Sequence, residues 1–162
     1  SHGENIFIKD CKNVDICDKA MVKYICGNTT VKNIYGNATV ENICGSATVE
    51  NIYGKATVEN ICDNATVKNI CGSATVEYIY GSAMVKYIYG NATVEYIYGS
   101  ATVKNIRDNA TVKSIYGNAT VISSPYTKWN NSASLIISDN ATFKDCYSKT
   151  IYQAGGWKLI EV

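Results

Sequence analysis

The sequence predicts an all-β fold, a β-solenoid in which short repeated segments stack as successive coils. Three observations predict it: a period of nine residues, strand-forming residues at fixed places in each copy, and a turn residue once per copy. Ten complete copies fill residues 27–116 without an insertion, and "GNATVENIC" at 36–44 is representative. Most copies contain a glycine at the same place, and a glycine every nine residues disfavours a long helix. One copy cannot bury its own apolar side, so copies must stack.

Three columns of the repeat are apolar and nearly constant, and Ala38, Val40 and Ile43 represent them. Each buried Val or Ile stabilises the fold by about 1.5–3 kcal/mol. The step of two from Ala38 to Val40 keeps both on one strand face. The step of three to Ile43 predicts a bend near Glu41 and Asn42. The variable columns hold Lys or Glu, Asn or Tyr, and Tyr, Cys or Arg, and they are expected to face solvent.

One further column holds glycine, with aspartate at positions such as 63 and 108, and is followed by Asn, Ser or Lys. This is turn chemistry, because these residues tolerate positive φ. Each copy therefore combines one short strand segment with one turn.

The pattern Ala-Thr-Val-x-x-Ile resembles that of pentapeptide-repeat and hexapeptide-repeat β-helices, where a small residue precedes an aliphatic one and then a corner. The resemblance covers about residues 18–122 and implies the architecture, although a nine-residue period fits neither family. The repeat also differs from the calcium-binding nonapeptide roll, which resembles GGxGxDxUx, because the acidic ligand position is missing. Asp63 and Asp108 are isolated, so neither a metal site nor a cofactor is expected.

The number of copies in one coil can be two or three. An 18-residue coil stacks cysteines and then tyrosines in one column: Cys26, Cys44, Cys62, Tyr80, Tyr98 and Tyr116. It also stacks glutamates such as Glu41 and Glu59, and like charges in register cost stability. A 27-residue coil alternates charge, but Ala, Val and Ile are too small to fill its wide section to native density. The sequence favours 18 residues, with 27 as the alternative.

The ends of the chain differ from the repeat. We interpret residues 1–17 as a tag remnant with degenerate repeats, 18–122 as the nonapeptide solenoid, and 123–162 as a loop and C-terminal cap. The opening "SHG" resembles an expression scar and holds the single histidine, His2. Pro125 cannot donate to a ladder, which predicts the loop. A site that does not recur in every repeat is expected in this last segment. Its candidate residues, chosen because they fall outside the regular repeat, are Trp129, Asp139, Asp145 and Trp157.

Composition limits the partners and the compartment. A formal charge of +1 gives no bulk electrostatic attraction for nucleic acid, and no apolar run approaches the roughly 20 residues of a membrane span. The seven cysteines are odd in number and form no C-x-x-C pair. They predict free thiols in a reducing compartment rather than a disulfide framework or a zinc site. A trimmed surface or phage protein is the alternative origin.

The tyrosines are the most suggestive surface feature, and six of them fall within the stretch "VEYIYGSAMVKYIYGNATVEYIYGS". The predicted binding patch comprises Tyr78, Tyr80, Tyr87, Tyr89, Tyr96, Tyr98 and Tyr116. In an 18-residue coil Tyr80 and Tyr98 become vertical neighbours about 4.8 Å apart, as do Tyr78 and Tyr96. These four are expected in one exposed patch, with Tyr87 and Tyr89 on the opposite side. Exposed aromatic clusters mark protein or carbohydrate contacts.

We therefore expect a non-enzymatic structural or binding module of adhesin, fibre or spacer type, able to self-associate through its ends or its Tyr-rich face. No catalytic residue is assigned, because no native histidine is available for a Ser-His or Cys-His pair. A β-helical carbohydrate-active enzyme is one alternative. A pentapeptide-type inhibitor that mimics DNA is another, although it needs an acidic surface. An ice-binding protein using the threonine column, as at 39 and 75, is a minor alternative that lacks Thr-x-Thr pairs.

Overall fold

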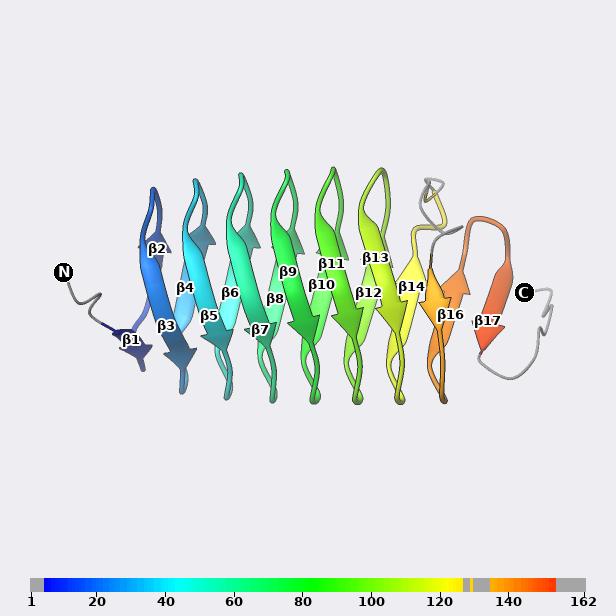
Figure 1. The fold of residues 1–162 in the computed structure, drawn as a ribbon, viewed down its shortest axis with the longest axis horizontal. Helices are drawn as coiled ribbons and strands as arrows, with labels where there is room; N and C mark the ends of the chain where they lie inside the picture. The colour runs from blue at the N-terminus through cyan, green and yellow to red at the C-terminus, as the bar shows by residue number, and fades with distance from the viewer. Residues whose placement is uncertain (1–4, 127–128, 130–134, 154–162) are drawn as a thin grey trace.

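The chain forms two β-sheets that face each other across one apolar core, and from Ile6 to Asp145 successive strands alternate between the two sheets (Figure 1). The structure is a computed structural model and describes residues 5–126, 129 and 135–153. Along the solenoid the strands within each sheet are parallel, and the coils stack along the long axis of the molecule. No helix occurs among the residues described. The prediction of an all-β solenoid is confirmed.

The strands alternate between the two sheets. The first sheet contains β1 (Ile6–Lys9), β3 (Met21–Cys26), β5 (Thr39–Ile43), β7 (Thr57–Ile61), β9 (Thr75–Ile79), β11 (Thr93–Ile97), β13 (Thr111–Ile115) and β15 (Ile136–Ile137). The second sheet contains β2 (Val14–Ile16), β4 (Thr30–Ile34), β6 (Thr48–Ile52), β8 (Thr66–Ile70), β10 (Met84–Ile88), β12 (Thr102–Ile106), β14 (Thr120–Ser123), β16 (Thr142–Asp145) and β17 (Thr150–Gln153).

The coil contains 18 residues, as the pairing of β5 with β7 shows. Thr39 lies opposite Thr57 and Ile43 opposite Ile61, and the same spacing joins β4 to β6 on the other sheet. This confirms the 18-residue prediction and excludes the 27-residue alternative. With two strands per coil, the small Ala, Val and Ile side chains from the two sheets fill the space between them.

The three apolar columns form the core. From Val31 to Val121 the inward valines are fully buried, as are the isoleucines from Ile25 to Ile115 and the alanines from Ala38 to Ala119. The strand pattern places Val40 and Ile43 inside although they are three residues apart. The bend expected near Glu41 does not interrupt the strand. The ladder instead passes from Val40 directly to Asn42, and the corners lie at the glycine column.

The glycine column needs glycine because its turns stack closely. At Gly36 φ is +72°, a left-handed conformation, and Ala38 N donates to Tyr35 O at 3.4 Å across the turn. A Cβ added to Gly54, one coil further on, would lie 3.0 Å from the backbone nitrogen of Gly36. A side chain is therefore disfavoured there unless it forms a compensating contact with the coil below.

The last coils depart from the repeat. Ser123 is buried at a position opposite Ile106, and its hydroxyl donates to Asp145 at 2.8 Å. Trp129 is buried edge-to-face against Phe143, with ring centroids 5.0 Å apart. β17 then turns back antiparallel to β16 and ends the second sheet. An antiparallel strand at this edge stops the regular parallel stacking.

In the part of the chain that the structure describes, no helix has the length and apolar character needed to cross a membrane.

Candidate functional site

Three tyrosines form a stacked column along one edge of the solenoid, where the chain leaves the first sheet. The rings of Tyr80 and Tyr98 lie 4.9 Å apart at 6° to each other, and those of Tyr98 and Tyr116 lie 4.8 Å apart at 2°. Each follows the isoleucine that ends its strand, so its place is set by the buried core position beside it. Face-to-face stacking at the coil repeat follows directly from the parallel register.

A second pair of tyrosines lies beside this column on the face of the first sheet. Tyr78 pairs with Tyr96, and their rings stack at 5.3 Å and 16°. Tyr78 also meets Tyr98 edge-to-face, with centroids 6.2 Å apart. The contact joins the pair to the edge column. We call the resulting group the tyrosine patch: Tyr78, Tyr80, Tyr96, Tyr98 and Tyr116.

The other two predicted tyrosines lie elsewhere. Tyr87 is in β10 of the second sheet, and Tyr89 follows that strand at the opposite edge. Each lies beside a cation: Lys86 Nζ is 5.2 Å from the Tyr87 ring centroid, and the Arg107 guanidinium is 4.8 Å from the Tyr89 centroid. The vertical pairing of 78 with 96 and of 80 with 98 is thus confirmed, and Tyr87 and Tyr89 are separate from the patch.

All seven predicted tyrosines are half-buried rather than fully exposed. Within the patch the stacking explains this, because each ring covers a face of the next one, whereas Tyr87 and Tyr89 lie against Lys86 and Arg107. The expectation that the Tyr, Cys or Arg column faces open solvent needs the same correction. Arg107 is half-buried and Cys62, beneath Tyr80, is only 7% exposed. What the column presents to solvent is mainly ring edges and hydroxyl groups.

Cysteines continue the edge column toward the N-terminus, where Cys26, Cys44 and Cys62 occupy the tyrosine position. All seven cysteines of the chain are free. Desolvation is the main cause that raises the pKa of Cys44 to about 11, and the neighbouring thiols add to it. A side-chain hydrogen bond to Cys62, followed by desolvation, raises the pKa of Tyr80 to about 12. Both groups are therefore neutral near pH 7.

Desolvation also raises the pKa of Tyr98 and of Tyr116. For Tyr78 the first cause of the raised pKa is its hydrogen bond to Glu77. With their pKa values raised, the phenols of Tyr78, Tyr80, Tyr98 and Tyr116 retain their protons, so these hydroxyls can donate as well as accept hydrogen bonds.

A matching pair of tyrosines lies on the opposite edge of the solenoid. Tyr35 and Tyr53 stack at 5.2 Å and 4°, but Cys71 takes the next position, so the stack does not continue. This short stack has the same ring geometry as the patch without its neighbours from the sheet face.

Asparagine ladders in the Asn or Tyr column support both sheets. Asn51 Nδ2 donates to Asn33 Oδ1 at 3.0 Å, and Asn69 Nδ2 donates to Asn51 Oδ1 at 2.9 Å. Each amide also reaches a backbone carbonyl where the strand ladder skips a residue, as Asn51 does with Lys32 O at 3.4 Å. The near-exclusive occurrence of Asn or Tyr in this column is the sequence signal that could have predicted the ladders.

The singular residues of the last segment make structural contacts. Trp129 Nε1 donates to the carbonyl of Ala110. Asp139 Oδ2 accepts the backbone N–H of Gly117 at 3.1 Å. Asp145 accepts from both Ser123 and Ser148. Trp157, the fourth candidate by scarcity, lies outside the described residues.

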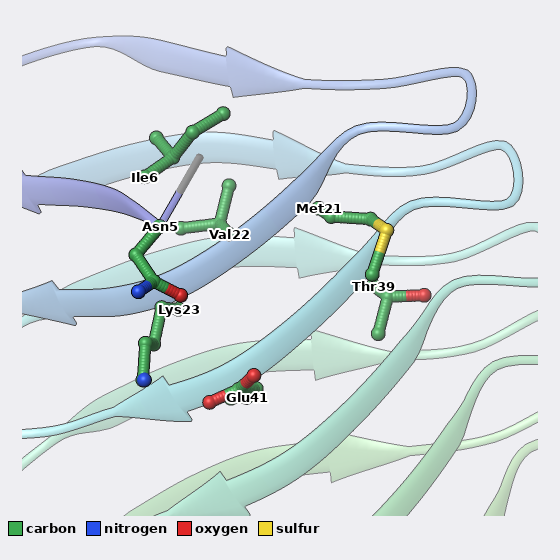
Figure 2. Close-up of a pocket in the computed structure, with 7 residues that line it drawn as sticks. All are labelled: Asn5, Ile6, Met21, Val22, Lys23, Thr39 and Glu41. Atoms are coloured by element: carbon green, nitrogen blue, oxygen red, sulfur yellow. The ribbon is translucent and has the colours of Figure 1, made fainter. Parts of the chain in front are cut away.

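Two small pockets lie in the described part of the chain. One of about 110 Å³ lies at the N-terminal end of the first sheet. Figure 2 shows Met21, Lys23, Thr39 and Glu41 along β3 and β5, with Asn5 and Ile6 beside them. Another, of about 170 Å³, lies near Lys144 and Ile151. Typical ligand pockets measure about 300–1,000 Å³, so the extended patch is the better candidate surface.

Among the described residues, no group of three or more His, Cys, Asp or Glu side chains is arranged to hold a metal ion.

Comparison with known proteins gave no match to a family model, to a curated protein or to a solved structure.

Proposed function

We propose that this protein is a non-enzymatic binding module, a repeat rod that presents the tyrosine patch to a partner. The observation that carries the proposal is the continuous stack of Tyr80, Tyr98 and Tyr116 at 4.8–4.9 Å, joined through Tyr98 to Tyr78. Structural modules of adhesin, fibre or spacer type combine such a rod with a lateral contact surface.

The stack favours binding because its side chains are already ordered. A free tyrosine loses rotamer freedom when a partner immobilises it, at a cost of about 0.5–1.5 kcal/mol for each rotamer-rich side chain. In the patch, neighbouring rings at near-parallel angles hold each side chain in place before any partner arrives. Tyrosine also combines a large apolar area with a hydroxyl that can form a hydrogen bond.

The orientation of the rings favours a protein partner. A sugar ring that stacks on tyrosine needs an open ring face, whereas Tyr98 has Tyr80 on one side and Tyr116 on the other. The patch instead offers apolar ring edges and hydroxyl groups, which suit the mixed surface of a polypeptide. Carbohydrate binding is the second outcome that the experiment distinguishes.

The proposal can be tested with the double variant Tyr80→Ser, Tyr98→Ser. A random peptide display library and a glycan array serve as probes for wild type and variant. We expect peptides selected on wild type to bind the double variant at least about tenfold more weakly, as expected when aromatic anchors are removed. Circular dichroism should show an intact fold, because Cys occupies this column in three other coils.

The matched control is Tyr35→Ser, Tyr53→Ser, which removes a stack of the same geometry from the opposite edge. It should leave peptide binding unchanged. If wild type binds a glycan and only the Tyr80, Tyr98 variant loses that binding, the patch remains the binding surface and the partner is a carbohydrate rather than a protein. Equal binding by wild type and both variants, or no selected ligand of either class, would refute the proposal.

A further inference from the structure

The charged column of the repeat divides by sign between the two sheets. From residue 68 to residue 104 it alternates every nine residues as Lys68, Glu77, Lys86, Glu95 and Lys104. Because consecutive copies lie on opposite sheets, this alternation places the glutamates on the first sheet and the lysines on the second. The two sheets lie on opposite sides of the molecule (Figure 1), so an alternating sequence becomes two ladders of like charge, one on each sheet.

We define the two ladders by their residues. The acidic face consists of Glu41, Glu59, Glu77 and Glu95 on β5, β7, β9 and β11, which are consecutive neighbours in the first sheet. The basic face consists of Lys68, Lys86 and Lys104 on β8, β10 and β12, which are consecutive neighbours in the second sheet. The remaining charged residues of the column lie at the margins of the two faces. Lys23 and Lys113 flank the acidic face, and Lys32 and Glu50 precede the basic face.

Most of these charged side chains form no salt bridge within the described part of the molecule. Among the described residues one salt bridge forms, between Lys113 Nζ and Glu95 Oε1 at 2.6 Å, at the end of the acidic face. Glu41 and Glu59 are exposed, as are all three lysines of the basic face. Like charges on directly opposed positions of neighbouring strands are destabilising. Each face therefore carries a repulsion that a surface of opposite charge would relieve.

The two faces also match in geometry. In β9 the glutamate is the third of five residues, and in β10 the lysine is the third of five. Both ladders repeat once per coil, at the strand spacing of about 4.8 Å. A second molecule with its axis aligned can therefore place a lysine opposite a glutamate at successive coils, with both columns at the centre of the contact.

We propose that the acidic face of one molecule binds the basic face of a second copy of this chain. The contact is heterologous, since a two-fold axis would bring like faces together. A bound pair retains a free basic face on one molecule and a free acidic face on the other, so the assembly grows as open-ended layers rather than closing as a dimer. The edge column of Tyr80, Tyr98 and Tyr116 lies between the sheets and remains at the side of such layers.

Two charge-reversal variants test the proposal. The first, Lys68→Glu, Lys86→Glu, Lys104→Glu, makes both faces acidic. The second, Glu41→Lys, Glu59→Lys, Glu77→Lys, makes both faces basic and leaves the Lys113–Glu95 salt bridge in place. Both folds should be retained, because the column accepts Lys and Glu throughout the repeat. Circular dichroism checks this before any association is measured.

Sedimentation velocity of the full chain supplies the readout. Wild type should associate at about 0.02 M NaCl and return to the 17.7 kDa monomer at about 0.5 M, where the Debye length is only a few ångström. Each variant alone should show an apparent Kd at least about 100-fold higher, because like charges then face each other. An equimolar mixture of the two variants should associate again at low salt.

The control variant Lys19→Glu, Lys55→Glu, Lys149→Glu changes net charge by the same amount as the first variant, at exposed positions outside the basic face. It should associate like wild type. A wild type that stays monomeric at low salt would overturn the proposal. So would variants that each associate as wild type does, or a mixture that remains monomeric. None of these proteins substitutes a tyrosine of the patch, and the first variant also keeps Glu77, the hydrogen-bond partner of Tyr78, so binding by the patch is measured separately on that variant.

Discussion

The carboxylate Oδ2 of Asp63 accepts a hydrogen bond from the backbone N–H of Gly45, one coil below, at 3.0 Å. Asp63 occupies the glycine column with φ of +58°. Asp108 makes the same contact with Gly90 at 3.3 Å. An aspartate in this column thus offsets an unfavourable backbone conformation with a charge-assisted hydrogen bond to the turn beneath it.

This contact predicts opposite outcomes for two substitutions of Gly54, where φ is +73°. Gly54→Ala should destabilise the fold by about 1–2 kcal/mol. The alanine would have to adopt a left-handed backbone conformation, and its Cβ would lie close to the backbone nitrogen of Gly36. Gly54→Asp should cost clearly less, since its carboxylate can accept the Gly36 N–H. Chemical denaturation followed by circular dichroism measures both, with exposed Lys55→Ala as a control within about 0.5 kcal/mol. Equal losses for Ala and Asp would contradict this account.

The asparagine ladder predicts a cost for Asn51→Ala. This change removes the donor to Lys32 O and to Asn33 Oδ1, and it removes the acceptor of Asn69 Nδ2. Leaving such groups without partners should lower the free energy of unfolding by about 1–3 kcal/mol. Asn37→Ala, at an exposed turn position, is the matched control. If both variants unfold at the same denaturant concentration, the ladder contributes nothing to stability.

The core predicts a graded response at Ile61, which is fully buried. Ile61→Val should destabilise by about 0.5–1.5 kcal/mol and Ile61→Ala by about 2–5 kcal/mol, because the stacked coils cannot collapse into the cavity. Ile136, which is 64% exposed, provides the comparison, and Ile136→Ala should have little effect. A loss of stability at Ile136 as large as that at Ile61 would be inconsistent with this core.

The thiol column predicts a loss of stability at alkaline pH. The folded state raises the pKa of Cys44 from 9.0 to about 11, so the folded protein keeps this proton where the unfolded chain has lost it. The resulting stability is complete below pH 9.0 and is lost as pH rises toward 11. Unfolding free energies measured across this range should fall for wild type and fall less steeply for Cys44→Ser. Identical slopes would show that Cys44 does not contribute.

Much of the fold was predictable from local pattern. The near-invariant Ala, Val and Ile columns identified the core, because only an inward position requires one size and polarity in every coil. Core volume favoured 18 residues per coil, because Ala, Val and Ile are too small to fill a 27-residue section, and the pairing of Thr39 with Thr57 confirms it. The vertical stacking of Tyr80 on Tyr98 followed from that register alone.

Other features could not be read from single columns. The outer Tyr and Cys column was expected to face solvent, but rings stacked from successive coils cover one another and Cys62 is buried. The bend near Glu41 was expected as a corner, whereas the strand continues and an Asn60 amide bonds the Glu41 carbonyl at 3.4 Å. Both outcomes depend on contacts between residues 18 or 19 apart.

The nine-residue pattern is sufficient to predict that this chain is a β-solenoid, where its core columns lie, and which position forms its turns. Those properties depend on a pattern of nine residues, and every copy of the repeat contains that pattern. The folded molecule was needed to show how far each outer side chain is buried, that Tyr78 meets Tyr98 edge-to-face, and that Glu77 and Lys86 belong to opposite faces. These properties arise because a coil combines two copies, so residues nine apart are separated by the core while residues 18 apart are in contact.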